Sequence, residues 1–256
     1  LSINTTGVNT HRLNYMEDFA DSFQEKAGKY SVEQFHRILD KIQKLPPNYK
    51  AWNLGLASAL ACCAFTFLLG GGIVEMICAF FGAGIGNFVR KLLLEKHITL
   101  LANVTIGVAS ACCVYVLLLE LAEIIMGVSS VHQAGYICSM LFIIPGFPLI
   151  TGGLDLAKLD LRSGLERITY ALLIITMATF TGWITATIFK FHPSEFTEMQ
   201  INPVLMLLFR LITSFCGVYG FSLMFNSPRK MAFTAGIIGM IANTLRLELI
   251  DFTSIP

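Results

Sequence analysis

Long apolar runs alternate with short polar segments over most of this chain. Seven runs follow the first 50 residues. They cover Trp52–Leu69, Ile73–Phe88, Ile98–Leu119, Ala134–Ile150, Ile168–Phe189, Val204–Phe225 and Met231–Leu245. A helix that crosses a bilayer needs about 20 mostly apolar residues. The runs are continuous and do not alternate, which excludes a closed membrane barrel. The pattern predicts an all-α, polytopic integral membrane protein with about seven transmembrane helices.

The first 50 residues are polar and predict a separate unit. Asn14–Ala27 and Ser31–Lys44 have the pattern of two amphipathic helices. In the second, Ser31 followed three residues later by Gln34 indicates a capping box, and Pro46-Pro47 ends the helix. We expect a cytosolic helical hairpin that packs against the membrane body, and we prefer this to a partner-binding module.

Composition also indicates a membrane protein, and it argues against nucleic-acid binding and metal binding. The chain is 55% hydrophobic and 14% charged, whereas soluble domains carry about a quarter charged residues. A net charge of +1 gives no footprint for nucleic acid. The seven cysteines lie in apolar runs, which favours packing over metal binding. No nucleophile elbow, phosphate loop or histidine cluster occurs, so we predict neither an enzyme nor a cofactor or metal site.

The basic residues indicate an orientation. They gather before the first run and in every second loop after it: Lys41, Lys44, Lys50, Arg90, Lys91, Lys96, Lys158, Arg162, Arg167, Arg229 and Lys230. Loops rich in lysine and arginine face the cytoplasm. We therefore place the N-terminus in the cytoplasm. The regular alternation also supports the count of seven spans.

The fourth run contains an unusual break. Pro145 and Pro148 lack amide donors and obstruct helix geometry, and Gly146 loosens the backbone between them. Irregular backbone at membrane depth is tolerated where protein or a water-filled cavity satisfies it, and broken helices recur in transporter binding sites. The alternative is a helix that simply ends before a cytoplasmic loop.

Four charged residues are further candidates for a substrate or ion path. Asp155 and Asp160 follow the break, and Arg167 lies seven residues after Asp160 on the same helix face. Arg210 lies seven residues into the sixth run, where an ionisable group is costly and suggests function. Glu166 can instead pair with Arg162 on a solvated helix.

Several motifs resemble the threonine/serine exporter family of bacteria and fungi. They begin with Gly7-Val8-Asn9 and Leu45-Pro46-Pro47-Asn48-Tyr49, followed by F-x-x-L-x-G-G-G from Phe65 to Gly72. Next come Pro145-Gly146, Asp155, Asp160, Ser163-Gly164 and Arg167. Residues 7–190 are similar to the N-terminal five-helix module of that family. Phe215–Asp251, with Phe225-Asn226-Ser227-Pro228-Arg229, resembles the start of its second module.

The resemblance implies three parts: residues 1–50 as the cytosolic segment, 51–190 as the first module, and 200–256 as the start of a second module. Most of that second module is then expected on the same chain or on a partner chain. Thr151 and Leu154 stand where family members often carry Asn and Arg, so the substrate can differ.

The resemblance also implies a secondary transporter that exports threonine and serine with proton coupling. We expect alternating access, with Pro145, Gly146 and Pro148 in the path and Asp155 or Asp160 in gating or proton exchange. Arg167 and Arg210 are expected to balance those charges or to meet a substrate carboxylate. Two alternatives remain: a dicarboxylate exporter subunit, as in split relatives, and a non-transporting assembly or signalling protein. Short loops and membrane-embedded cysteines suit a bacterial plasma membrane.

Overall fold

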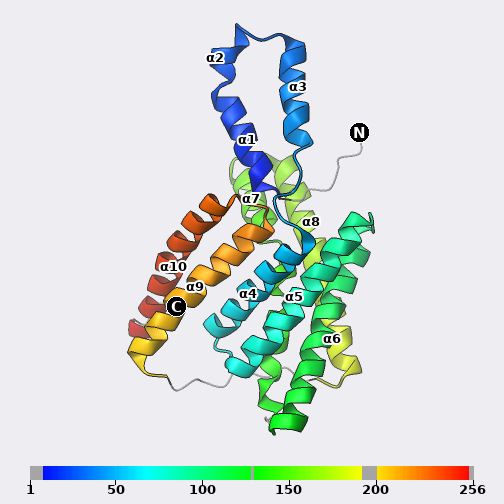
Figure 1. Cartoon of the computed structure of the whole chain (residues 1–256), viewed down its shortest axis with the longest axis vertical. Helices are drawn as coiled ribbons and strands as arrows, with labels where there is room; N and C mark the ends of the chain where they lie inside the picture. The colour runs from blue at the N-terminus through cyan, green and yellow to red at the C-terminus, as the bar shows by residue number, and fades with distance from the viewer. Residues whose placement is uncertain (1–7, 128–129, 192–200, 254–256) are drawn as a thin grey trace.

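The computed structural model describes residues 8–127, 130–191 and 201–253. Gly7 and the outermost bounds of the first and third predicted parts therefore lie outside the described residues. Every regular element in the described part is a helix (Figure 1). The helices are α1 Thr10–Asp21, α2 Phe23–Ala27, α3 Val32–Gln43, α4 Ala51–Leu68, α5 Ile73–Glu95, α6 Leu100–Met126, the 3₁₀ helix η1 Ser130–Ile143, α7 Gly146–Ala157, α8 Leu161–Ile188, α9 Pro203–Met224 and α10 Arg229–Phe252.

Six of the described helices are long and apolar enough to cross a membrane: α4, α5, α6, α8, α9 and α10. A further pair, Gly135–Ile143 and Gly146–Ala157, is bent by 62° at its break. If this bent pair is one span, the total is seven. The prediction of an all-α polytopic protein is confirmed, and the fourth predicted span is the broken one.

The 3₁₀ helix η1 lies at the centre of the bundle. It contacts α4, α5, α6 and α8, while α4 also packs against α9 and α9 against α10. Tyr136 fixes η1 to α8, because its hydroxyl donates to the carbonyl of Gly182 at 2.8 Å. The broken element therefore runs through the interior of the bundle.

The two ends of the bundle differ in charge. The hairpin end, where α4, α6, α8 and α10 begin, carries the basic segments around Arg90, Lys158 and Arg229. The far end is where α5 and α9 begin. The basic loops, which alternate with other loops along the sequence, thus lie together at one end of the bundle.

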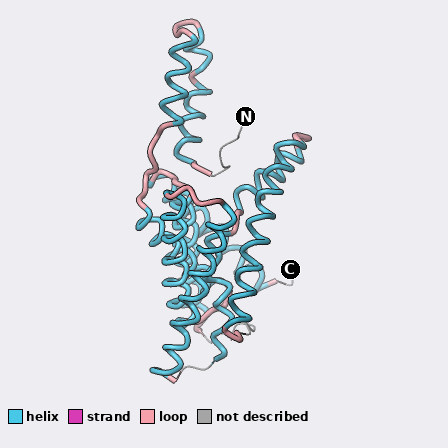
Figure 2. The backbone as a smooth tube through the Cα atoms, turned by 90° about the vertical axis from the view of Figure 1, so that its right-hand side faces the viewer, coloured by secondary structure: helices cyan, strands magenta, loops and turns pink. Residues whose placement is uncertain are grey.

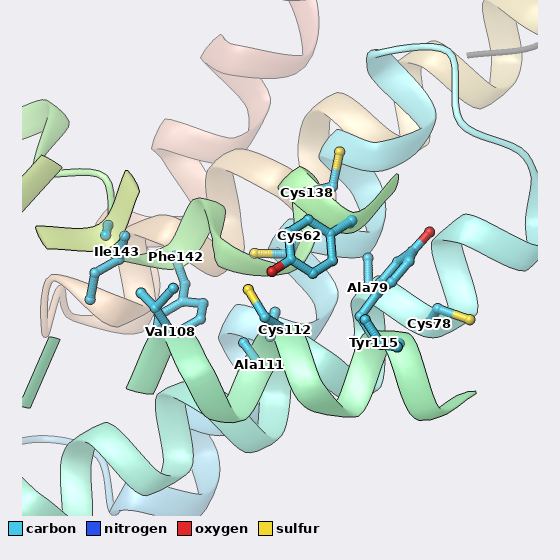
Figure 3. Packing of buried hydrophobic residues seen from close by; sticks show 14 of the residues in the cluster. Cys62, Cys78, Ala79, Val108, Ala111, Cys112, Tyr115, Cys138, Phe142 and Ile143 are labelled. Atoms are coloured by element: carbon cyan, nitrogen blue, oxygen red, sulfur yellow. The ribbon is translucent and has the colours of Figure 1, made fainter. Parts of the chain in front are cut away.

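Small residues and buried cysteines form the core between α4, α5, α6 and η1 (Figure 3). Cys62, Cys78, Cys112 and Cys138 are buried there and unbridged. Gly86 allows α5 and α6 to approach, since a Cβ added there would lie 2.6 Å from the Cβ of Ala111. Close helix packing through small residues is typical of membrane bundles, where apolar burial alone does not favour association.

The N-terminal hairpin differs from the expectation. Helices α1–α3 form an arm that projects from the bundle instead of packing along it (Figure 2). The predicted capping box is present: Ser31 Oγ accepts from Gln34 N at 3.4 Å, and Gln34 Oε1 accepts from Ser31 N at 2.9 Å. Contacts between α1 and α3, among them the edge-to-face contact of the Phe19 and Phe35 rings, hold the arm together.

Candidate functional site: a cavity at the broken helix

The chain breaks between η1 and α7 for a local reason. Pro145 precedes α7 as its N-cap residue, and Pro148 lies in the first turn of α7. A first-turn proline is tolerated because its missing amide donor would have had no intrahelical partner. Pro145 also denies a donor to the last turn of η1, so the helix axis turns here.

A cavity of about 190 Å³ opens beside this break. Its wall combines the end of η1, the start of α7, the hairpin-end turns of α5, α6 and α8, and the end of α9. The described polar residues of the lining are Arg90, Lys91, Asn103 and Tyr170, and no aspartate or glutamate belongs to the described lining. Its volume is below the roughly 300–1,000 Å³ of pockets for drug-sized ligands, which suits a solute of a few carbon atoms.

Two polar atoms at this cavity lack a protein partner. The Nε of Arg90 and the Oδ1 of Asn103 are both buried and have no hydrogen bond within the described part of the chain. Asn103 is 1% exposed, and its Nδ2 donates to the carbonyl of Arg90 at 3.0 Å. Two hydrogen-bonded residues of the cavity lining thus carry an unsatisfied cationic donor and an unsatisfied neutral acceptor, and unsatisfied buried polar atoms are uncommon in folded proteins.

Helix packing sets the position of Arg90. A Cβ added at Gly107 of α6 would lie 3.1 Å from the Cβ of Arg90. The glycine thus lets the stem of Arg90 lie directly on α6, one turn from Asn103. An arginine that is not paired with a protein carboxylate remains available for a carboxylate ligand, which its planar guanidinium binds through two parallel hydrogen bonds.

Asp155 and Arg167, predicted as path residues, pair with each other. The Nη1 of Arg167 lies 2.8 Å from the Oδ2 of Asp155 and links α7 to α8. Neither residue lines the cavity. The two helices approach closely at Gly152 and Gly164, where a Cβ added at Gly164 would lie 3.0 Å from the carbonyl of Gly152. The pair therefore braces the α7–α8 hairpin that positions the break.

Asp160, the second acidic residue predicted for the path, lies between α7 and α8. It is the N-cap of α8, and its Oδ1 accepts from Ser163 N at 3.3 Å. Hydrogen bonds from the side chain and backbone of Ser163 hold the pKa of Asp160 below its ordinary value. Its side chain is exposed and is not among the cavity lining. The charge of Arg167 also lowers the pKa of Asp160, while the ion pair of Arg167 is with Asp155.

Arg210 does not balance the charges near the break. It lies near the start of α9, at the far end of the bundle, and it contacts α10. Its guanidinium donates to Glu248 at 2.7 Å and forms an ion pair with Asp251 at 2.7 Å. Arg210 is thus neutralised by two carboxylates of α10, while Asp155 pairs with Arg167.

Of the seven predicted path residues, Pro145 and Pro148 line the cavity, and Gly146 lines an apolar groove beside it with Phe147. Arg90, Lys91, Asn103 and Tyr170 were missed. The first two had been assigned to a basic loop, but α5 continues through them to Glu95. Asn103 could have been found from the sequence, because it is a polar residue inside an otherwise apolar run.

The fold defines an integral membrane protein of the α-helical polytopic class, with a mostly apolar cavity that also has polar lining residues beside a broken central element. Comparison with known families assigns it further. The family model described as "Putative threonine/serine exporter" matches residues 1–189, and the chain belongs to that family. Membership makes it a transporter-family protein.

The names of two curated relatives refer to a different substrate, succinate. The chain is 30% identical over 141 residues to the "Probable succinate transporter subunit YjjP" of Escherichia coli, which covers 55% of this chain and 53% of that protein. It is 27% identical over 180 residues to the protein of the same name from Klebsiella aerogenes, which covers 70% of this chain and 66% of that protein. The match thus spans about half the length of the first relative and about two thirds of the length of the second. No solved structure matches.

Proposed function

We propose that the protein is a secondary transporter that exports small carboxylates, with the cavity at the broken helix as its substrate site. The observation that carries the proposal is Arg90, a residue of the cavity lining whose buried Nε has no hydrogen-bond partner in the described part of the chain. A carboxylate satisfies an arginine in its bidentate geometry. The break gives the cavity a wall whose backbone can rearrange, as transport by alternating access requires.

The charge of the cavity favours a dicarboxylate as the substrate. Arg90 and Lys91 supply two cationic groups, and the described lining supplies no carboxylate in return. A dianion of four carbon atoms satisfies both. This agrees with the name of the two relatives, which refers to succinate.

Threonine and serine form the second candidate substrate pair, favoured by the description of the family. Their carboxylate can bind Arg90 as well. Their ammonium group needs acceptors, and the cavity offers the free Oδ1 of Asn103 and the hydroxyl of Tyr170. Neutral acceptors hold an ammonium less strongly than a carboxylate does, so we rank these amino acids below the dicarboxylate.

We also propose that export is coupled to protons and that the active transporter contains a second set of helices. The pair of Asp155 and Arg167 at the base of α7 and α8 can open or close with the break, which gives it a place in gating. The name of the relatives includes the word subunit. We infer that the active transporter includes further helices, on the same chain or on a partner, and that it works in a bacterial plasma membrane with the hairpin end in the cytoplasm.

The test is solute efflux from proteoliposomes that contain the full-length protein with any partner subunit. Vesicles are loaded with radiolabelled succinate or threonine, with and without an acidic exterior, and empty vesicles serve as the control. We expect succinate to leave faster than threonine and the acidic exterior to accelerate it. Faster threonine efflux would reverse the order of substrates. Efflux of neither solute would overturn the assignment of the cavity to transport.

A further inference from the structure

A hydrogen-bonded junction at the hairpin end joins three segments that are far apart in the sequence. They are the start of α1, the link between α3 and α4, and the turn between α9 and α10. Asn226, in the third segment, adopts a left-handed conformation with φ of 62°. Asparagine tolerates this region better than most residues do, so the turn needs no glycine here.

Asn226 bonds to both other segments with its side chain. Its Nδ2 donates to Asn9 Oδ1 at 2.8 Å, and its Oδ1 accepts from Asn48 N at 2.8 Å. Asn48 Nδ2 in turn donates to the carbonyl of Asn226 at 3.1 Å. Asn226 is thus hydrogen-bonded to Asn9, which precedes the hairpin, and to Asn48, which follows it.

Thr10 and Tyr49 complete the junction. The amide of Thr10 donates to the carbonyl of Phe225 at 3.0 Å, and its hydroxyl lies 2.7 Å from Ser227 Oγ. The hydroxyl of Tyr49 donates to the carbonyl of Ser227 at 2.8 Å. Together these bonds fix the residues on both sides of Asn226.

The junction meets the cavity through Val8 and Phe225. Both residues line the cavity, and each is the immediate neighbour of a junction residue. The ring of Phe225 also lies against Phe147, just after the break, with ring centroids 6.0 Å apart. Any displacement of the junction therefore moves the cavity wall and a contact of the broken element together.

The hairpin is coupled to the junction as one body. Asn9 caps α1, since its Oδ1 accepts from Arg12 N at 3.2 Å as well as from Asn226. Arg12 Nη2 donates to the carbonyl of Leu45 at 2.8 Å and ties α1 to the end of α3. The start of α1 is thus hydrogen-bonded both to the segment after α3 and to the α9–α10 turn.

We propose that this junction is a latch that holds Val8 and Phe225 across the hairpin-end mouth of the cavity, and that tilting of the arm releases it. The inference rests on the proposed function, because it describes how access to that substrate site is controlled. In the structure the latch is closed. Release frees the end of α9 to swing away from Phe147 and exposes Arg90 and Asn103 to water from the hairpin end.

The test measures access to the cavity and needs no substrate. The reporter is the substitution Asn103→Cys, whose reaction rate with a water-soluble maleimide is measured in the purified full-length protein. The same protein without this substitution gives the background from the native cysteines. We expect slow labelling with the latch intact.

Asn226→Gly, combined with the reporter, opens the latch. Glycine keeps the left-handed conformation but removes both side-chain bonds, so we expect labelling to accelerate by about tenfold. Thr10→Val is the milder variant, because it removes only the hydroxyl bonds, and we expect an acceleration of about threefold. Asn243→Ala is the matched control, because it removes the bond from Asn243 Nδ2 to Ser214 Oγ, 2.9 Å long, between the same two helices away from the junction.

An unchanged labelling rate in Asn226→Gly, or an equal acceleration in Asn243→Ala, overturns the latch. If Asn226→Gly does not fold, Thr10→Val decides: an unchanged rate there rejects the proposal in the same way. Labelling does not depend on transport. A latch that opens as expected in a protein that moves neither succinate nor threonine would therefore leave the latch standing and reject the proposed function alone.

Discussion

At the scale of single residues, the cavity is defined by polar atoms that the protein leaves unsatisfied. A buried donor or acceptor without a partner costs about 1–3 kcal/mol, so the Nε of Arg90 and the Oδ1 of Asn103 together favour binding of a ligand that satisfies both. The sequence could not reveal that Arg90 lines a cavity. Lysine and arginine residues occur both in loops and in the last turn of a helix, so their presence alone does not distinguish the two. The sequence did reveal the prolines, whose effect on the backbone is local.

The ion pair of Asp155 and Arg167 gives the first prediction. Asp155→Asn or the reversal Asp155→Arg removes the bond that braces α7 against α8, so we expect export to fall in either variant while the protein stays in the membrane. The double variant Asp155→Arg with Arg167→Asp restores the pair with its charges exchanged, and we expect it to recover most of the export. Efflux assays on the four proteins check this. Wild-type export in Asp155→Asn, or a double variant as poor as the singles, would show that the pair has no role.

At the scale of elements, the apolar runs predicted which helices exist but not how long they are. The second run ended at Phe88, whereas α5 ends at Glu95, and the fifth began at Ile168, whereas α8 begins at Leu161. Hydropathy reports the part of a helix in contact with lipid or core. Backbone hydrogen bonds continue the same helix into water, where polar residues are equally well accommodated. The polar end of α5 supplies Arg90, so this part of the site was hidden in a segment that the pattern assigned to a loop.

Helix spacing gives the second prediction. Gly86→Ala places a methyl group 2.8 Å from the carbonyl of Gly107, so α5 and α6 must separate. We expect the variant to lose about 1–3 kcal/mol of stability, as overpacked cores do. Gly153→Ala is the control, because a Cβ there meets nothing within 4 Å. Thermal unfolding in detergent measures both, and a Gly86→Ala protein as stable as Gly153→Ala would contradict the packing.

At the scale of the whole molecule, segments at opposite ends of the chain meet at one end of the bundle. Asn9, Asn48 and Asn226 belong to three motifs noted in the sequence, yet nothing in their spacing indicated that they form one junction, because their contacts span 178–217 residues. The projecting arm was also missed. An amphipathic pattern shows that a helix buries one face, but not whether the face packs on the bundle or on a second helix of the arm.

Orientation gives the third prediction. The basic residues gather at the hairpin end, which we expect to face the cytoplasm. Glu33→Cys on the exposed arm should resist a membrane-impermeant thiol reagent added to intact cells, while Ile125→Cys at the far end, where the side chain is 71% exposed, should react. The native cysteines are measured in the unsubstituted protein as the background. The opposite labelling pattern would invert the assigned direction of transport.

The most direct test of the account is the equilibrium binding of radiolabelled succinate to the purified full-length protein with any partner subunit. Arg90→Gln removes the cavity guanidinium, and Arg162→Gln is the control, because Arg162 is 88% exposed and pairs with Glu166 on the surface of α8. Hydrogen bonds to charged groups are worth about 1.5–3 kcal/mol, so we expect Arg90→Gln to weaken binding by about tenfold or more and Arg162→Gln to leave it unchanged. Equal affinity in the wild type and Arg90→Gln would contradict the assignment of the cavity as the carboxylate site.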